Sequence, residues 1–266
     1  MDLGLKDRVV VVTGSSRGIG QAIAAAFARE GCRLIINGRH GKDLEAAVAE
    51  MRGGPGTVHA VVADVTTPEG AQRLIDETIA LCGTVHVLVN NTGGIGRLGA
   101  FAELTDQEWF DVFNLNVMSA VRVTRAALPH MQKQKWGRII NISSESGTQP
   151  DPVMPHYNAA KAAITSFTKS LSKAYASDNI LVNTVSPSLI RTELVEQMFA
   201  AEAKAQGISV DEAEKIHVRG FRPNILFGRA GRPHETAGIV LFLASNEATF
   251  ITGSNFRVDG GSVASI

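Results

Sequence analysis

Short runs of β-branched and apolar residues alternate with longer helical patterns along nearly the whole chain. The strand candidates lie at 9–12, 34–37, 58–62, 85–90, 138–142, 181–185 and 255–258. The helical stretches lie at 18–30, 42–52, 68–82, 105–134, 155–177, 191–206 and 234–245. Repeated strand–helix units favour a parallel sheet, and continuously apolar strands suit burial on both faces. We therefore predict an α/β protein with a doubly wound, seven-stranded parallel sheet and helices on both faces.

No internal repeat, low-complexity tract or linker divides the 266 residues, so we expect a single domain spanning 1–266. The 26 basic and 26 acidic residues balance, which leaves no basic excess for nucleic acid or an anionic membrane. The N-terminus lacks an apolar signal region, and no apolar run approaches the roughly 20 residues of a membrane span. Neither Cys32 with Cys82 nor the seven histidines show metal-ligand spacing. These features predict a cytoplasmic protein with no metal site.

A glycine-rich turn, Thr-Gly-Ser-Ser-Arg-Gly-Ile-Gly at 13–20, joins the first strand to the first helix. Gly14 permits the tight turn, Gly18 lets the backbone approach a pyrophosphate, and Gly20 allows close helix–strand packing. The helix N-terminus offers unpaired N–H groups and partial positive charge to a phosphate. A mere tight turn is the alternative, but the strand–turn–helix context favours a dinucleotide site that includes Ser16, Arg17 and Ile19.

The end of the second strand is the next point that selects a cofactor. An acid there would bind the ribose 2′-hydroxyl of NAD, but this chain has Gly38 and Arg39 instead. The arginine suits a 2′-phosphate, and Arg17 is a second candidate cation. The alternative is that Arg39 simply points to solvent. We predict that NADP(H) is preferred and that NAD(H) is possible.

Two further segments follow strands at the carboxyl edge, where open parallel sheets bind ligands. Asp64 and Val65 come after the third strand, where a short acid can accept a hydrogen bond from an adenine amino group. Asn90, Thr92 and Gly93 end the fourth strand. Asn90 is equally suited to contact the cofactor or only to hold loops together.

Tyr157 and Lys161 stand at i and i+4 of a predicted helix and so share a face. A tyrosine with a pKa of about 10 is a poor acid or base at neutral pH, but a nearby ammonium lowers that pKa. Taken alone, they are equally a surface pair. Ser144 ends the 138–142 strand, where its hydroxyl could donate to a substrate carbonyl. Asn116 is a polar break in an apolar helix, and it either binds water in a proton path to Lys161 or caps a helix distortion.

With these motifs the chain resembles the classical short-chain dehydrogenase/reductase (SDR) family from about residue 6 to the C-terminus. The matches are the turn at 13–20, Asn-Asn-Thr-Gly at 90–93 with Thr92 in place of the usual alanine, and Val-Asp-Gly-Gly at 258–261. The family's catalytic tetrad falls on Asn116, Ser144, Tyr157 and Lys161. Where the family usually has Pro-Gly, this chain has Pro187 and a serine, followed by Thr192. A serine there is expected to stiffen or re-aim the loop beside the nicotinamide.

The resemblance implies a single Rossmann-fold domain that transfers a hydride between nicotinamide C4 and a small-molecule carbonyl or secondary alcohol. It makes Tyr157 the general acid/base and Ser144 the group that orients the carbonyl. Lys161 would bind the nicotinamide ribose and depress the pKa of Tyr157, and Asn116 would hold a relay water. The chain is most similar to 3-oxoacyl-thioester reductases and to sugar or polyol dehydrogenases. An NAD(H)-dependent sugar or polyol dehydrogenase and a catalytically silent nucleotide-binding protein are the alternatives.

Substrate specificity is expected from the segment at about 188–233. Arg219 and Arg222 either receive a carboxylate or phosphate, or belong to a solvated lid, which we favour. In that lid, their expected partners are Glu202, Glu212 and Glu214. An acyl-carrier-protein substrate would need a basic docking surface; Lys133, Lys135 and Arg138 offer a small one, but Asp178 and the balanced total charge disfavour it.

The helices at 105–134 and 155–177 are apolar on more sides than one sheet-covering stripe requires. A partner subunit would cover the second face, and a thick monomer core is the alternative. Because the family also suggests four subunits, we predict a homotetramer.

Overall fold

Seven parallel strands form one sheet in this computed structural model, which describes residues 2–265. They are β1 (Val9–Val12), β2 (Arg33–Gly38), β3 (Thr57–Val62), β4 (Val87–Asn90), β5 (Gly137–Ile142), β6 (Ile180–Pro187) and β7 (Asn255–Val258). Their order is β3-β2-β1-β4-β5-β6-β7, and each neighbouring pair is parallel. The predicted doubly wound sheet is confirmed, and the chain reverses its direction of travel across the sheet between β1 and β4.

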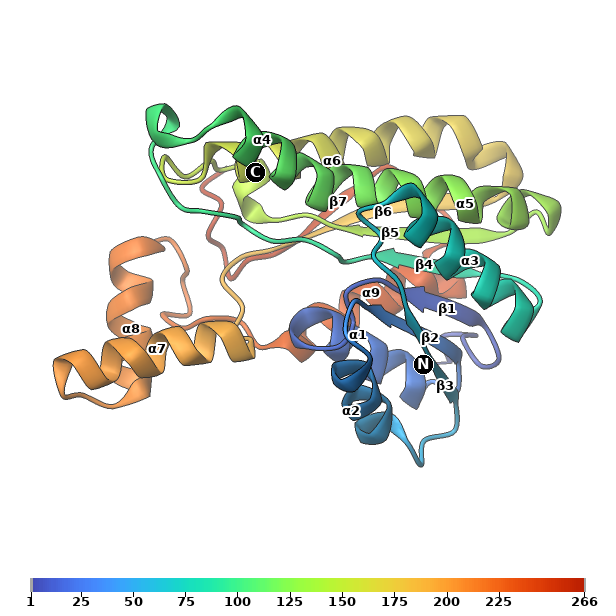
Figure 1. Ribbon diagram of the computed structural model, residues 1–266, viewed down its shortest axis with the longest axis horizontal. Helices are drawn as coiled ribbons and strands as arrows, with labels where there is room; N and C mark the ends of the chain where they lie inside the picture. Colours follow the sequence, from blue (N-terminus) through green and yellow to red (C-terminus); the bar gives the residue numbers. More distant parts are fainter. Residues whose placement is uncertain (1, 266) are drawn as a thin grey trace.

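Helices cover both faces of the sheet (Figure 1). One face carries α1 (Gly18–Arg29), α2 (Gly41–Met51) and α9 (Pro233–Ala244), and the other carries α3 (Pro68–Cys82), α5 (Ser119–Lys133) and α6 (Pro155–Tyr175). Short 3₁₀ turns lie at Phe101–Glu103, Glu145–Gly147, Ala176–Asp178 and Asn246–Ala248. No helix within residues 2–265 combines the length and the apolar character that a membrane crossing requires.

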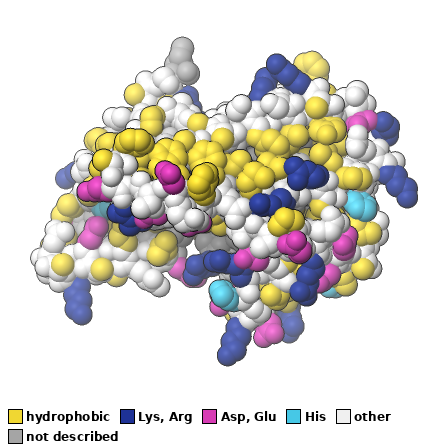
Figure 2. Space-filling model, turned by 45° about the horizontal axis from the view of Figure 1, so that its top comes forward, with side chains coloured by type: hydrophobic (Ala, Val, Ile, Leu, Met, Phe, Trp, Pro, Cys, Tyr) yellow, Lys and Arg dark blue, Asp and Glu magenta, His cyan; other side chains and the backbone are white. Residues whose placement is uncertain are grey.

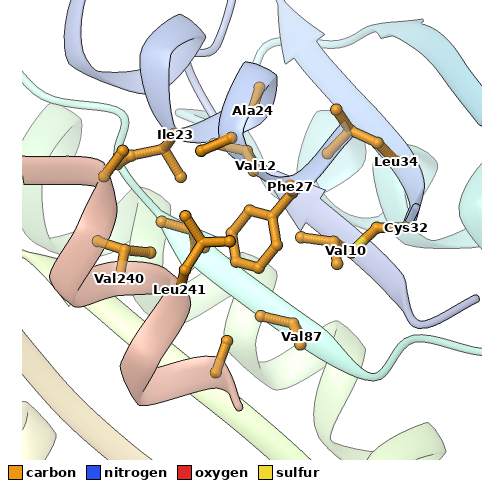
Figure 3. Close-up of a cluster of buried hydrophobic side chains, with 14 of the residues drawn as sticks. Val10, Val12, Ile23, Ala24, Phe27, Cys32, Leu34, Val87, Val240 and Leu241 are labelled. Atoms are coloured by element: carbon orange, nitrogen blue, oxygen red, sulfur yellow. The ribbon is translucent and has the colours of Figure 1, made fainter. Parts of the chain in front are cut away.

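The central strand β1 is apolar throughout because both of its faces are buried. Val10 and Val12 face α1 and α9, where the fully buried ring of Phe27 fills the space beside Leu241 (Figure 3). The intervening valines of β1 join the opposite core under α3 and α5. Two cores therefore clamp β1 from both sides, which fixes the position of the glycine turn that follows it.

The predicted helix at 105–134 is wrong as a single element. It is divided into α4 (Asp106–Phe113), a π-helical turn at Asn114–Met118, and α5. A π-turn inserts a residue into the helical hydrogen-bond ladder, and such turns often occur at functional sites. Asn116 lies in this turn, so the polar break noted in the sequence marks a real distortion.

A second difference is in the segment expected to be a lid, which contains two helices. Alongside α7 (Glu193–Gln206), which was predicted, stands α8 (Val210–Phe221), which was not. Ser209 caps α8 by accepting a hydrogen bond from the Glu212 backbone N–H at 3.2 Å. The two helices project together from the carboxyl edge of the sheet (Figure 1). A parallel bridge between Ile190 and Gly231 closes the neck of this excursion.

Candidate active site

The glycine turn after β1 folds so tightly that side chains are excluded from it. Gly14 and Gly18 have φ values of +59° and +62°, in the left-handed region that favours glycine. A Cβ at residue 20 would lie 2.4 Å from both the Gly14 carbonyl oxygen and the Asn91 amide nitrogen. Gly20 therefore lets the start of α1 approach β1 and β4 closely, which leaves the helix N-terminus facing the open side of the turn.

Hydrogen bonds tie the glycine turn to the end of β4. The Asn91 side-chain amide donates to the carbonyls of Thr13 (3.0 Å) and Gly14 (2.9 Å). The Thr13 hydroxyl in turn accepts from the backbone N–H groups of Asn91 (3.0 Å) and Thr92 (3.1 Å). Sequence reasoning did not assign Thr13 or Asn91 to the site, although both stand inside quoted motifs. Their bonds cross the point where the sheet order reverses.

Asn90 is held inside the protein rather than at the site surface. Its amide donates to Asn141 (2.8 Å) and to Thr124 (3.0 Å), and the Asn141 amide donates to Thr168 (2.8 Å). This chain joins β4 and β5 to α5 and α6. Of the two roles left open for Asn90, the geometry favours holding the surrounding segments together.

The end of β2 has space beside Gly38, where the chain is predicted to distinguish NADP from NAD. A Cβ at Gly38 would make only ordinary contacts, at 3.5 Å, with Ser16 and Leu44. Arg17 and Arg39 are both exposed. Burial acts to raise the pKa of Asp64, but hydrogen bonds from Thr66 and the charge of Arg39 bring it below its usual value. Arg39 and Asp64 are therefore close enough to interact along this edge.

Tyr157 and Lys161 lie near the beginning of α6, facing the end of β5. The Lys161 ammonium is buried, donates to the Ile142 carbonyl at 3.0 Å, and lies 5.5 Å from the centroid of the Tyr157 ring. The Ser144 hydroxyl accepts from the Ser146 backbone N–H at 3.1 Å, and it lies near enough to the Tyr157 phenol to lower its pKa. The structure thus brings together the three residues that the spacing singled out.

The prediction that Lys161 lowers the pKa of Tyr157 is wrong, because the pKa of Tyr157 is raised. Burial raises the pKa of Tyr157, Glu145 adds to this, and Ser144 and Arg222 only partly oppose it. Burial also lowers the pKa of Lys161 to about 8. The physical reason is that desolvation disfavours both charged forms, and the Lys161 ammonium lies over the ring face while bonded to a backbone carbonyl.

Asn116 is buried and connects the π-turn to the loop after β4. Its amide donates to the carbonyls of Val112 (2.9 Å) and Gly94 (2.8 Å), and its oxygen accepts from the Gly94 N–H at 3.2 Å. A Cβ at Gly93 would lie 2.7 Å from the Asn116 oxygen and 3.1 Å from the Lys161 nitrogen. The helix-distortion role is therefore present, and the same amide lies beside Lys161. The relay water stays a prediction.

The segment after β6 approaches the glycine turn. A Cβ at Gly18 would lie 3.3 Å from the Thr192 methyl group, so Thr192 stands directly over the turn. Ser188, next to Pro187, does not have the positive φ that would demand glycine, and its N–H donates to the Val258 carbonyl at 3.2 Å. The serine is accommodated here without backbone strain.

The expected ion-pair partners of Arg222 are wrong. Arg222 pairs with Glu145 (2.9 Å) and Asp151 (2.8 Å), which lie between β5 and α6. Of the expected glutamates, Glu214 pairs with Arg191 and Arg232, and Glu202 contacts His217. These ion pairs join segments that the tertiary structure brings together, so spacing along the helix does not predict them.

Arg138 is buried and does not contribute to the small basic surface considered for an acyl carrier protein. Its side chain is 1% exposed, and its guanidinium stacks 4.3 Å from the centroid of the Trp136 ring. Lys135 pairs with Asp178, which reduces the free positive charge at this surface further.

Comparison with known proteins decides the family. Residues 8–203 match the family described as short chain dehydrogenase. The chain belongs to this family. It is therefore an oxidoreductase that acts on CH–OH or C=O groups with NAD or NADP. The fold and the glycine turn fit such a dinucleotide, because the turn presents backbone N–H groups and excludes side chains.

Several relatives of this SDR protein match it along its whole length. The uncharacterized oxidoreductase YvrD of Bacillus subtilis is 38% identical over 100% of both chains. The 3-oxoacyl-[acyl-carrier-protein] reductase FabG of Thermotoga maritima is 34% identical over 97% of this chain and 99% of its own. The crystal structure of L-sorbose reductase from Gluconobacter frateurii, complexed with NADPH and L-sorbose, is 34% identical and covers 100% of both chains with a TM-score of 0.94.

The buried Lys161 predicts a pH-dependent stability. Its pKa is about 8 in the folded protein and 10.5 for an unperturbed lysine, so between these values the unfolded chain binds more protons. The free energy of unfolding should therefore rise as pH increases through this window, by up to about 3 kcal/mol from Lys161. Urea unfolding at several pH values measures this rise, and Lys161→Met should remove that part of it. Equal pH dependence in the parent and Lys161→Met would contradict a buried, depressed ammonium.

Proposed function

We propose that this SDR protein reduces a carbonyl group with NADPH and that Tyr157 is the general acid. The observation that carries the proposal is the convergence of Lys161 and Asn116 on Gly93, with the Lys161 ammonium 5.5 Å from the centroid of the Tyr157 ring and Ser144 acting on the pKa of its phenol. Because burial raises its pKa, the phenol holds its proton at neutral pH. That protonation state is the one a reductase needs in its acid.

Each member of the tetrad then has a distinct task. Ser144 donates to the substrate carbonyl oxygen and orients it, and Tyr157 gives that oxygen its proton. Lys161 binds the nicotinamide ribose, and its ammonium favours the phenolate left after the transfer. Asn116 fixes the loop at Gly93 and Gly94 and holds a relay water. When bound, the dinucleotide supplies the hydride from its nicotinamide ring.

The cofactor-binding residues follow the carboxyl edge. We assign the pyrophosphate to the turn with Gly14, Gly18 and Gly20, and the 2′-phosphate to Arg39 and Arg17. The other contacts proposed are Ser16, Ile19, Gly38, Asp64, Val65, Thr92, Gly93, Tyr157, Lys161, Pro187 and Thr192, while Asn90 keeps its role of holding the surrounding segments together. The absence of a carboxylate at residue 38 supports NADPH over NADH. NADPH in the sorbose reductase crystals is consistent with this preference.

For the substrate we favour a neutral hydroxyketone of the sugar type. The L-sorbose reductase similarity supports this class. Arg222 is already paired with two carboxylates, which makes it a poor receptor for an anionic substrate. The 3-oxoacyl-[acyl-carrier-protein] reductase relatives favour a second candidate, an acyl thioester ketone. Comparing kcat/KM for L-sorbose and for an acetoacetyl thioester separates the two.

We also propose a cytoplasmic homotetramer. Seen toward α4, α5 and α6, apolar side chains form a broad band across the surface (Figure 2). Within α4 and the π-turn that follows it, the exposed fractions of Phe110 and Met118 are 68% and 37%. Light scattering should give about four times the chain mass of 28.3 kDa at micromolar concentration. A mass of one chain would contradict the assembly.

The catalytic role is tested by Tyr157→Phe. Loss of a general acid should lower the reduction rate about 10²–10⁴-fold, while NADPH affinity changes little because the glycine turn is untouched. The chain's other tyrosine offers a matched control, Tyr175→Phe at the end of α6, which should retain the parent rate. Steady-state kinetics with any ketone that the parent accepts measures both. Near-parent turnover in Tyr157→Phe would refute the role.

Cofactor choice is tested at the end of β2. The parent should prefer NADPH over NADH by at least about tenfold in kcat/KM, because charge-assisted hydrogen bonds to the 2′-phosphate are worth about 1.5–3 kcal/mol each. Gly38→Asp with Arg39→Leu should reverse the preference, and Gly38 has room for the new side chain. Arg52→Leu, at an exposed arginine after α2, is the control. Equal use of both cofactors by the parent would show that Arg39 does not read the phosphate.

A further inference from the structure

Arg222 follows the last residue of α8 and reaches back to the loop between β5 and α6. Its Nε lies 2.9 Å from Glu145 Oε1, and its Nη1 lies 2.8 Å from Asp151 Oδ2. The side chains of Arg222, Asp151 and Glu145 are 21%, 19% and 4% exposed. One guanidinium thus holds two carboxylates in a largely water-excluded cluster, a geometry that suits its planar fork of donors.

Each of these carboxylates belongs to a segment that carries a catalytic residue. Glu145 directly follows Ser144. The Asp151 carbonyl accepts from the Asn158 amide at 2.7 Å, and Asn158 directly follows Tyr157. Arg222 is therefore connected to the Ser144 segment through one carboxylate and to the Tyr157 segment through the other.

The helices behind Arg222 are joined so that they can move together. Arg191 pairs with Glu196 at the beginning of α7 and with Asp211 and Glu214 on α8. The bridge at the neck closes the excursion, which projects from the body of the protein (Figure 1). Among the ion pairs within residues 2–265, those of Arg222 alone join α8 to the β5–α6 loop. Arg222 therefore supplies the ionic contacts that hold the end of α8 against this loop.

Removing Arg222 would leave Glu145 as a poorly compensated charge. Glu145 is 3% exposed, and its second carboxylate oxygen is buried with no hydrogen-bond partner among the described residues. Losing one member of such a pair is strongly destabilising to the local arrangement. Glu145 and Arg222 also act in opposite directions on the pKa of Tyr157, with Glu145 raising it and Arg222 lowering it.

We propose that Arg222 is a positioning residue for the reaction, because its ion pairs latch α7 and α8 onto the segments that carry Ser144 and Tyr157. The proposal rests on the carbonyl reduction proposed above. It makes Arg222 part of the site without contact with substrate or cofactor. It also explains why an arginine in the substrate segment is paired inward instead of being left for an anion.

The test compares Arg222→Gln with Arg219→Gln, which removes an exposed arginine of α8 that has no ion pair among the described residues. Arg222→Gln should lower kcat/KM for the ketone about 10- to 100-fold, as expected for a displaced catalytic geometry, with NADPH affinity unchanged. Arg222→Lys should recover only part of the loss, because an ammonium cannot match the fork. Arg219→Gln should behave as the parent does.

A pH profile distinguishes a positioning role from simple loss of structure. The charged groups around Tyr157 are Glu145, Arg222 and Lys161. With Glu145 left unopposed, the apparent pKa of the acid in kcat/KM should move upward in Arg222→Gln. Adding Glu145→Gln should return the profile toward that of the parent. An unchanged profile and parent-like kcat/KM in Arg222→Gln would overturn the proposal.

Hydrogen exchange supplies a readout that needs no activity. Backbone amides in α7 and α8 should exchange faster in Arg222→Gln than in Arg219→Gln, while those of the β-sheet stay the same. If the parent reduces no ketone, the proposed function fails, and this comparison still decides the latch. Equal exchange in the two variants would overturn it. If Arg222→Gln does not fold, the double variant with Glu145→Gln, which removes both buried partners, takes its place in the same comparison.

Discussion

The hydrogen bonds between the glycine turn and the end of β4 are the interaction on which the rest of the site depends. Thr13 and Asn91 exchange side-chain and backbone bonds across the point where the strand order reverses. Two cores that clamp β1 hold one side of this junction, and the Asn90–Asn141–Thr168 bonds hold the other. Because the strands are parallel, their carboxyl ends meet at one edge, so Gly93, Ser144 and the beginning of α6 all stand beside the turn.

Burial is the largest influence on the pKa values of Lys161 and Tyr157 at this edge of the sheet. The protein takes the Lys161 ammonium out of water and gives it one backbone carbonyl, so its pKa falls to about 8. The half-buried Tyr157 phenol beside it has a raised pKa and keeps its proton. In this arrangement Tyr157 holds its proton until the substrate oxygen takes it. The nearby Lys161 ammonium then stabilises the phenolate that forms.

Sequence patterns predicted features whose causes are local. The strands follow from continuous apolar runs, the turn from its glycines, and the shared face of Tyr157 and Lys161 from helical spacing. The polar break at Asn116 correctly marked a distortion, but not its π-turn geometry. The family motifs identified the four residues of the tetrad, and the structure shows the contacts that each of them makes.

The failures arose where tertiary structure decides. Helix α8 was missed because its apolar residues are interspersed with charged ones, and the face it buries is set by its packing in the folded protein. The capping signal of Ser209 with Glu212 was nevertheless present in the sequence. The pairing of Arg222 with Asp151 spans 71 positions, which no local spacing reveals. The pKa of Tyr157 was predicted from its neighbour in the helix, whereas burial by the whole fold determined its direction.

Transfer of deuterium from NADPH that carries deuterium at both C4 positions of the nicotinamide tests the central claim most directly. Mass spectrometry of the alcohol formed from an accepted ketone would locate the label. One deuterium is expected on the former carbonyl carbon, in proportion to the NADPH consumed. An unlabelled alcohol, or bound NADPH that is not oxidised by any member of a broad ketone and ketose panel, would contradict it.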